Sequence, residues 1–117
     1  MITIYTLKTC DTCKKALKWL DNNNVEYANH DVRTDGLSRS DIELIVTSIG
    51  WETAVNRRST TWRGLDEAEK TDIDNEKAIN LIERNPTLMK RPVFLAEGFA
   101  LAGFDTAAQQ KLGEITS

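Results

Sequence analysis

Apolar and polar residues alternate over the start of the chain and then change to helical spacing. Residues 1–7 alternate, which is typical of a strand with one buried face. Four apolar residues then recur at i, i+3, i+4 and i+7, which predicts an amphipathic helix: Cys13, Ala16, Leu17 and Leu20. Residues 25–32 are rich in β-branched and aromatic residues and predict a second strand. The first third of the chain therefore predicts a β-α-β unit with parallel strands.

The middle of the chain carries mainly helical patterns. An S-x-x-D capping pattern begins at Ser38, and the apolar stripe that follows ends at Gly50. Residues 51–70 have a weaker pattern, which predicts short helical turns and a loop. Asp74 can cap a further helix, which Pro86 closes. We therefore expect helices and no strands in this region.

Strand patterns return near the C-terminal end. Residues 92–96 and 99–102 are short apolar runs separated by a turn at Gly98, which predicts a hairpin. Asp105 can cap a final helix. The element order predicts an α/β fold in which residues 1–117 form one domain, with a helical insertion over about residues 35–85.

Composition narrows the class of protein. The 117 residues are enough to bury a core without disulfide or metal cross-links. With 15 basic and 18 acidic residues the net charge is −3, which disfavours direct binding to nucleic acid. No apolar run is long enough to span a membrane, and the first residues lack the basic and apolar regions of a signal peptide. We expect a cytoplasmic monomer that does not bind membranes.

The chain has two cysteines, Cys10 and Cys13, and they lie where the first strand gives way to the first helix. The N–H groups of a helical first turn favour a thiolate, so Cys10 is the candidate nucleophile. Cys13 lies one turn further and is the candidate resolving thiol. The alternative is that two small apolar side chains share a helix face. A structural zinc site needs four ligands, and beside the two cysteines the chain has only one histidine, His30. We therefore expect no metal site.

Four segments resemble a known family. They are YTLKTCDTCKKA at residues 5–16, RSTTW at 58–62, KRP at 90–92 and GF at 103–104. Together they resemble the arsenate reductase-like family of the thioredoxin superfamily, which joins glutaredoxin-linked arsenate reductases, Spx redox regulators and YffB-type proteins. The resemblance implies a thioredoxin-like fold with a four-stranded mixed sheet. Phe104 resembles the YffB-type branch, whereas the second cysteine of the CxxC motif is shared with Spx.

The resemblance also implies roles for single residues. It makes Cys10 the nucleophile and gives Arg58 and Arg91 an anion site. It also implies a cis peptide bond before Pro92, which exposes a backbone edge for pairing with a peptide-like thiol substrate and makes Pro92 a substrate-binding residue. Guanidinium groups stay charged and bind oxyanions and carboxylates, so the anion is arsenate or a carboxylate of glutathione.

One departure from the family pattern disfavours arsenate. Arsenate reductases of this type have a third arginine near the position of Phe104, and no arginine follows Arg91 here. Loss of one charge-assisted hydrogen bond, worth roughly 1.5 to 3 kcal/mol, lowers oxyanion affinity by one or two orders of magnitude. Arg57 and Arg63 are expected to be solvated side chains without a site role.

Three functions follow from these residues and the resemblance. The first is a thiol oxidoreductase without a tightly bound cofactor, using glutathione or a small thiol as co-substrate, with glutaredoxin as a further partner. The second is a redox regulator that resembles Spx, in which a Cys10–Cys13 disulfide changes binding to RNA polymerase. The third is a glutaredoxin-coupled arsenate reductase.

Overall fold

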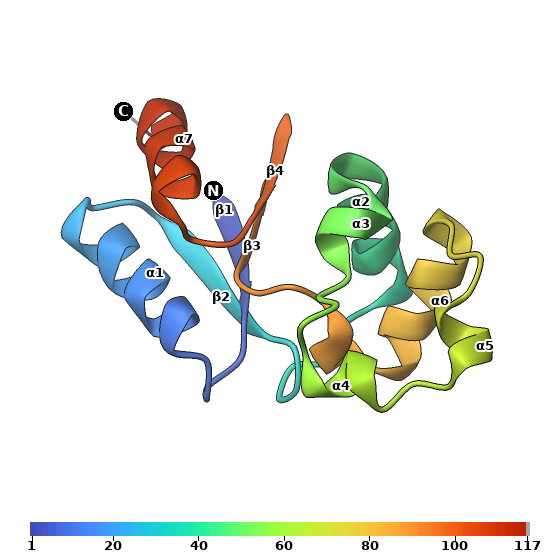
Figure 1. The fold of residues 1–117 in the computed structure, drawn as a ribbon. Helices are drawn as coiled ribbons and strands as arrows, with labels where there is room; N and C mark the ends of the chain where they lie inside the picture. The colour runs from blue at the N-terminus through green and yellow to red at the C-terminus, as the bar shows by residue number, and fades with distance from the viewer. Residues whose placement is uncertain (117) are drawn as a thin grey trace. The chain divides into compact units, whose positions relative to one another are not determined.

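The computed structural model describes residues 1–116, and Figure 1 shows their fold. The chain forms two compact units: unit 1 contains residues 1–31 and the segment from residue 91 onward, and unit 2 contains residues 32–90. Unit 2 includes the helical insertion expected over about residues 35–85 and extends beyond it at both ends. That the two units act as one domain stays a prediction.

Unit 1 is a sheet with two helices. Its elements are β1 (Ile2–Thr6), α1 (Asp11–Asn22), β2 (Tyr27–Asp31), β3 (Val93–Ala96), β4 (Phe99–Ala102) and α7 (Thr106–Thr116). The strand order is β2-β1-β3-β4. β1 and β2 are parallel, whereas β3 is antiparallel to both β1 and β4. The four-stranded mixed sheet expected from the family resemblance is thus confirmed.

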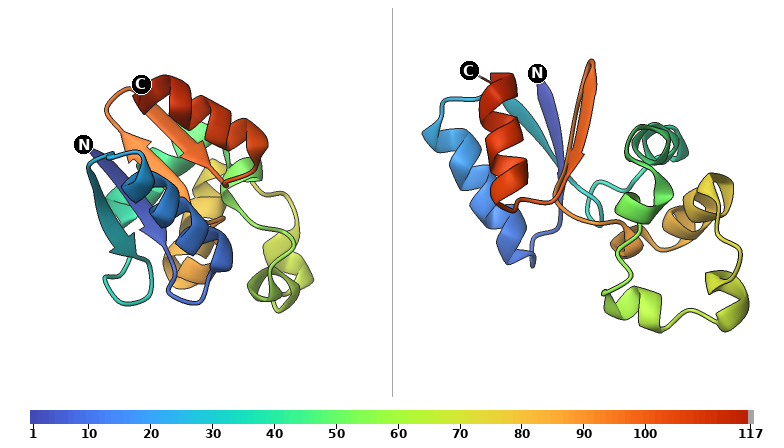
Figure 2. Two further views of the ribbon diagram at one scale, coloured as in Figure 1. Left: turned by 90° about the vertical axis from the view of Figure 1, so that its left-hand side faces the viewer. Right: turned by 45° about the horizontal axis from the view of Figure 1, so that its top comes forward.

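Helices α1 and α7 lie on the same face of this sheet, as the two views in Figure 2 show. Alternate residues of a strand share a face, so Ile2 and Ile4 of β1 both point toward the helices. The core of unit 1 is a buried apolar cluster from four elements: Ile2, Ile4, Ala16, Leu20, Phe94 and Leu112. The apolar stripe predicted for the first helix is therefore the face of α1 that packs on the sheet.

The second strand is shorter than predicted. Residues 25–32 were expected to be extended, but β2 covers Tyr27–Asp31. The N–H of Val25 donates to the carbonyl of Leu20 at 3.0 Å, and Asn24 has a φ of 55°. Val25 therefore belongs to the turn that ends α1, because its backbone satisfies a helix carbonyl instead of a sheet partner.

Unit 2 is helical, as predicted. It contains α2 (Arg39–Ile49), α3 (Trp51–Ala54), α4 (Thr60–Arg63), α5 (Glu67–Lys70), α6 (Asn75–Arg84) and the 3₁₀ helix η1 (Pro86–Leu88). α2 packs against α6. The core of unit 2 is a set of fully buried apolar residues: Ile42, Ile45, Val46, Leu81, Ile82, Leu88 and Met89. The weak pattern of residues 51–70 corresponds to three helices of one turn each.

Candidate functional site

The sulfur of Cys10 lies at the N-terminal end of α1. Cys10 is the N-cap residue, with extended backbone angles (φ −89°, ψ 111°), and its N–H donates to the carbonyl of Leu7 at 2.9 Å. Its Sγ accepts a hydrogen bond from the backbone N–H of Cys13 at 3.2 Å. The half-buried sulfur therefore faces the positive end of the helix dipole, where negative charge is stabilised.

Cys13 lies on the inward stripe of α1 and is only 1% exposed. Burial, followed by the hydrogen bond to Cys10 and the nearby charge of Cys10, raises the pKa of its thiol to about 12, against lowering effects from the Leu7 backbone and Arg91. Both cysteines are free thiols. The pair therefore combines a partly accessible sulfur with a buried one that stays protonated at neutral pH.

Arg91 and Pro92 lead into β3. The peptide bond between them is cis, which confirms the expectation from the family resemblance. The carbonyl of Pro92 accepts from the N–H of Gly103 at 2.8 Å, which ties the entry of β3 to the end of β4. Because the charge of Arg91 acts on Cys13, unit 1 brings the predicted residues Cys10, Cys13 and Arg91 into one neighbourhood.

Asp31 supports the cysteine loop and was not identified from the sequence. It lies at the end of β2, is 6% exposed, and its Oδ2 accepts from the backbone N–H of Lys8 at 3.0 Å. Lys8 comes two residues before Cys10, so the carboxylate holds the loop that positions the sulfur. The signal in the sequence was an aspartate near the end of a predicted strand. A carboxylate that is buried there needs polar partners such as a backbone N–H.

We expect replacement of Asp31 by alanine to lower the free energy of unfolding by about 1 to 3 kcal/mol, because the N–H of Lys8 loses its acceptor. Asp31→Asn keeps an acceptor oxygen, so its free energy of unfolding should fall by less. Urea unfolding measures both variants, with the exposed Glu26→Ala as control, for which a change within about 0.5 kcal/mol is expected. Equal stability of Asp31→Ala and wild type would contradict this role.

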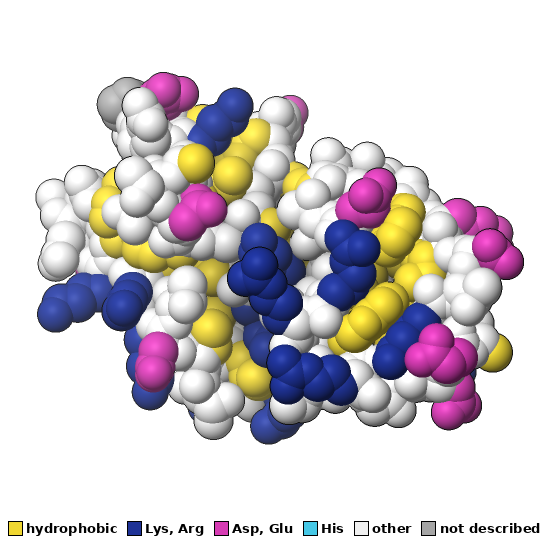
Figure 3. Space-filling model, viewed as in Figure 1, with side chains coloured by type: hydrophobic (Ala, Val, Ile, Leu, Met, Phe, Trp, Pro, Cys, Tyr) yellow, Lys and Arg dark blue, Asp and Glu magenta, His cyan; other side chains and the backbone are white. Residues whose placement is uncertain are grey.

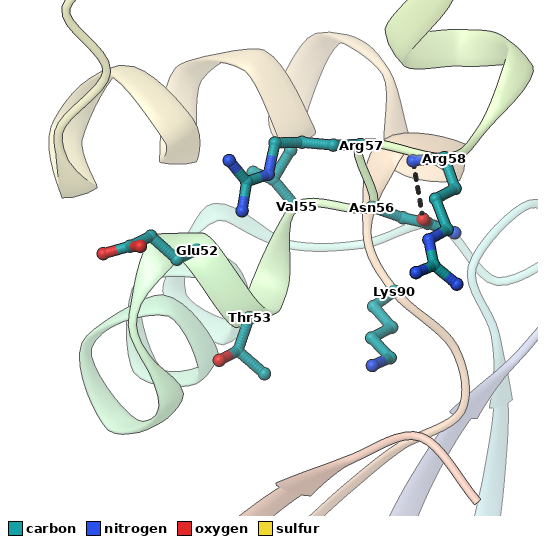
Figure 4. A pocket seen from close by; sticks show the side chains of 7 residues that line it. All are labelled: Glu52, Thr53, Val55, Asn56, Arg57, Arg58 and Lys90. Carbon is teal, nitrogen blue, oxygen red and sulfur yellow. Dashed lines mark hydrogen bonds between the residues drawn. The ribbon is translucent and has the colours of Figure 1, made fainter. Parts of the chain in front are cut away.

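Arg58 lies in unit 2, at a pocket of about 570 Å³ (Figure 4). The pocket is lined by the end of α3, the loop after it and Lys90: Glu52, Thr53, Val55, Asn56, Arg57, Arg58 and Lys90. The backbone N–H of Arg58 donates to Oδ1 of Asn56 at 3.1 Å. Arg57 is exposed, as expected, but it also lines the pocket, and its guanidinium lies 5.8 Å from the centre of the Trp51 ring. Arg57 and Lys90 are thus pocket residues that the sequence did not single out.

Basic side chains are prominent over this region. In the space-filling view, Lys and Arg side chains lie over α3 and α4 (Figure 3). Among residues 1–116, no group of three or more His, Cys, Asp and Glu side chains is arranged to hold a metal ion. In the same part of the chain, no helix is long and apolar enough to cross a membrane.

Comparison with known protein families shows the family to which this chain belongs. A model of the ArsC family matches residues 5–112. The chain belongs to the ArsC family. An uncharacterized protein of Haemophilus influenzae is 49% identical to this ArsC-family protein over 110 residues, which cover 94% of this chain and 96% of that protein. The global transcriptional regulator Spx of Streptococcus mutans is 31% identical over 107 residues, which cover 90% of this chain and 77% of that regulator.

A solved structure of a YffB protein is similar in fold and sequence. It has a TM-score of 0.88 and 41% identity, and the match covers 95% of this chain and 97% of that one. The thioredoxin-like fold expected for an ArsC-family protein is therefore confirmed. Both the YffB and the Spx branches that the sequence motifs indicated are represented among its relatives.

Phe104 shows what this ArsC-family protein has in place of a third arginine. Its ring centre lies 6.4 Å from the ring centres of Trp19 and of Phe94. The side chain therefore packs among aromatic rings at the edge of the unit 1 core and offers no hydrogen-bond donor to an oxyanion. That arsenate is a disfavoured substrate stays a prediction.

Proposed function

We propose that this ArsC-family protein is a cytoplasmic thiol oxidoreductase with Cys10 as nucleophile and glutathione or another small thiol as co-substrate. The observation that supports this proposal best is the placement of the Cys10 sulfur at the N-terminus of α1, where it accepts the N–H of Cys13. A sulfur so placed attacks as a thiolate. Arg91 supplies positive charge in the same neighbourhood, suited to a carboxylate or other anion on the substrate.

The reaction balances as two exchange steps. The Cys10 thiolate attacks one sulfur of a disulfide, forms a mixed disulfide, and releases the other sulfur as a thiolate that takes up a proton from solvent. A glutathione thiolate then attacks the mixed disulfide and regenerates Cys10. Each cycle consumes one glutathione thiol, releases one thiol from the substrate disulfide and leaves a new disulfide that contains glutathione. Glutaredoxin is a candidate donor in place of this glutathione.

The raised pKa of Cys13 bears on which thiol resolves the intermediate. Burial, the largest cause of the raised pKa, persists when Cys10 is held in a mixed disulfide, so the Cys13 thiol must still lose a tightly held proton before it can attack. Glutathione, with an ordinary thiol, is therefore the better resolving nucleophile at neutral pH. This favours a route in which Cys13 supports Cys10 through its N–H while its sulfur stays protonated.

A trapping experiment tests the proposal. The Cys13→Ser variant is incubated with glutathione disulfide, and intact-protein mass spectrometry should show one glutathionyl group, mapped to Cys10. The matched Cys10→Ser variant should show none, because the buried Cys13 is neither exposed nor ionised. Absence of an adduct on Cys10, or equal labelling of Cys13, would overturn the proposed role of Cys10.

A second candidate function is a redox regulator that binds RNA polymerase. The two-cysteine motif and the 31% identity to the regulator Spx of Streptococcus mutans support it. This function predicts that the protein with a Cys10–Cys13 disulfide is retained on immobilised RNA polymerase, whereas the reduced protein is not. If neither the oxidised nor the reduced protein binds RNA polymerase, this candidate function is eliminated.

A further inference from the structure

The pocket of unit 2 gathers three basic side chains that are not neutralised by ion pairs. In unit 2, Arg39 and Arg84 form ion pairs with glutamates. Within residues 1–116, no salt bridge joins Arg57, Arg58 or Lys90 to a carboxylate. A cluster of like charges without partners is costly unless solvent or a ligand compensates it. The pocket therefore presents its positive charge to an incoming molecule.

The frame of this pocket is fixed by backbone hydrogen bonds between two segments far apart in sequence. The N–H of Asn56 donates to the carbonyl of Leu88 at 2.9 Å, and the N–H of Lys90 donates to the carbonyl of Ala54 at 2.8 Å. Val55 and Met89 form an antiparallel bridge between these bonds, and both are buried. The positions from which the basic side chains project are therefore held before a ligand binds, which lowers the entropic cost of binding.

The pocket has two chemically different sides. Figure 4 shows the side chains of Arg58 and Lys90 on one side and the carboxylate of Glu52 on the other, with the guanidinium of Arg57 nearer to Glu52. Three positive charges and one negative charge leave a net charge of +2 on these four side chains. A ligand with two negative groups and one positive group can place each of its charges against a side chain of opposite charge in this pocket.

We propose that this pocket binds a small peptide-like zwitterion with two carboxylates and one ammonium group. Its volume of about 570 Å³ lies within the range of small-molecule sites, roughly 300 to 1,000 Å³. Arginine pairs with carboxylates in a bidentate manner, and Glu52 can receive the ammonium group. Glutathione has this pattern of charges, and the choice of that thiol as the ligand rests on the proposed function.

S-methylglutathione is the probe, because it carries the same charges but cannot form a disulfide. Isothermal titration should show saturable binding of one molecule to the wild-type chain. Arg57→Ala and Lys90→Ala should each weaken binding about tenfold, which corresponds to about 1.4 kcal/mol. Arg63→Ala is the matched control: it removes an exposed arginine of α4 that does not line the pocket, and it should leave affinity unchanged.

Two modified probes test the charge pattern. The dimethyl ester of S-methylglutathione lacks both carboxylates and should not bind measurably. Its N-acetyl derivative lacks the ammonium charge and should bind wild type and Glu52→Gln with equal affinity, whereas the unmodified probe should favour wild type. Equal binding of the diester and the parent probe, or full competition by inorganic phosphate at the same concentration, would show an unspecific anion effect and overturn the proposal.

The outcomes separate this inference from the role of Cys10. Binding of S-methylglutathione requires no thiol, so it should persist in Cys10→Ser. If the probe binds but Cys10 does not react with glutathione disulfide, the pocket stands and the proposed reductase fails. If Cys10 reacts but Arg57→Ala and Lys90→Ala leave probe binding unchanged, the reductase stands and the pocket assignment fails.

Discussion

Replacement of Cys10 by serine is expected to lower disulfide reduction by at least about 10³-fold. A serine hydroxyl is not ionised at neutral pH and cannot form a mixed disulfide, so the proposed covalent step is lost. The fold should survive, because serine is a favoured N-cap residue and its Oγ can accept the N–H of Cys13 as the sulfur does. The measurement is the rate of glutathione-dependent reduction of a small mixed disulfide.

Cys13→Ser is the control for this experiment. If glutathione resolves the intermediate, this variant should keep its rate within about tenfold of wild type, because only the packing of α1 is changed. An equal loss in both variants would replace the glutathione route by a dithiol route. Full activity of Cys10→Ser would contradict the nucleophile assignment altogether.

The second large effect concerns the titration of Cys13. With a pKa raised from 9.0 to about 12, its thiolate fraction at pH 8 is lower than that of an ordinary thiol by about 10³. Iodoacetamide at pH 8 should therefore modify Cys10 long before Cys13 in the folded protein. Timed alkylation followed by peptide mass spectrometry measures both rates, and unfolding in urea should bring Cys13 up to the rate of a free thiol. Comparable rates in the folded protein would contradict the burial of Cys13.

The same pKa shift makes stability depend on alkaline pH. The folded state holds the Cys13 proton more tightly than the unfolded chain, so its contribution is complete below pH 9 and is lost as the pH rises from 9 toward 12. The free energy of unfolding should fall by about 1.4 kcal/mol per pH unit in that window from this group alone. Urea unfolding of wild type and Cys13→Ala at pH 8 and 10.5 isolates the effect, because other groups titrate in both. A difference between the two proteins that stays constant with pH would contradict it.

Local signals allowed the helix starts to be predicted. Ser38, Asp74 and Asp105 each accept a backbone N–H three residues ahead, at 3.2, 2.8 and 2.8 Å. The side chain and its partner are close in sequence, so the capping pattern contains all the information needed. The CxxC motif was recognisable for the same reason, because Cys10 caps the helix that carries Cys13.

Other features depend on contacts between distant segments and were missed. The Asp31 carboxylate meets Lys8 only after β2 pairs with β1. The pocket joins Arg57 to Lys90, which lie 33 positions apart, through the isolated bridge between Val55 and Met89. A single pairing of this kind leaves no periodic pattern, and exposed basic residues resemble ordinary solvated ones.

The division of unit 1 into two segments has a consequence for synthesis on the ribosome. β1 lies between β2 and β3, and β3 begins at Val93, after the whole of unit 2. When β2 has emerged from the ribosome, β1 can pair only with β2. The other edge of β1 has no partner, and the core of unit 1 lacks Leu112, until the residues that follow unit 2 are made. Unit 2 is contiguous and has all its residues available earlier. Unit 1, which contains the cysteine pair, is therefore completed only after all of unit 2 has been made.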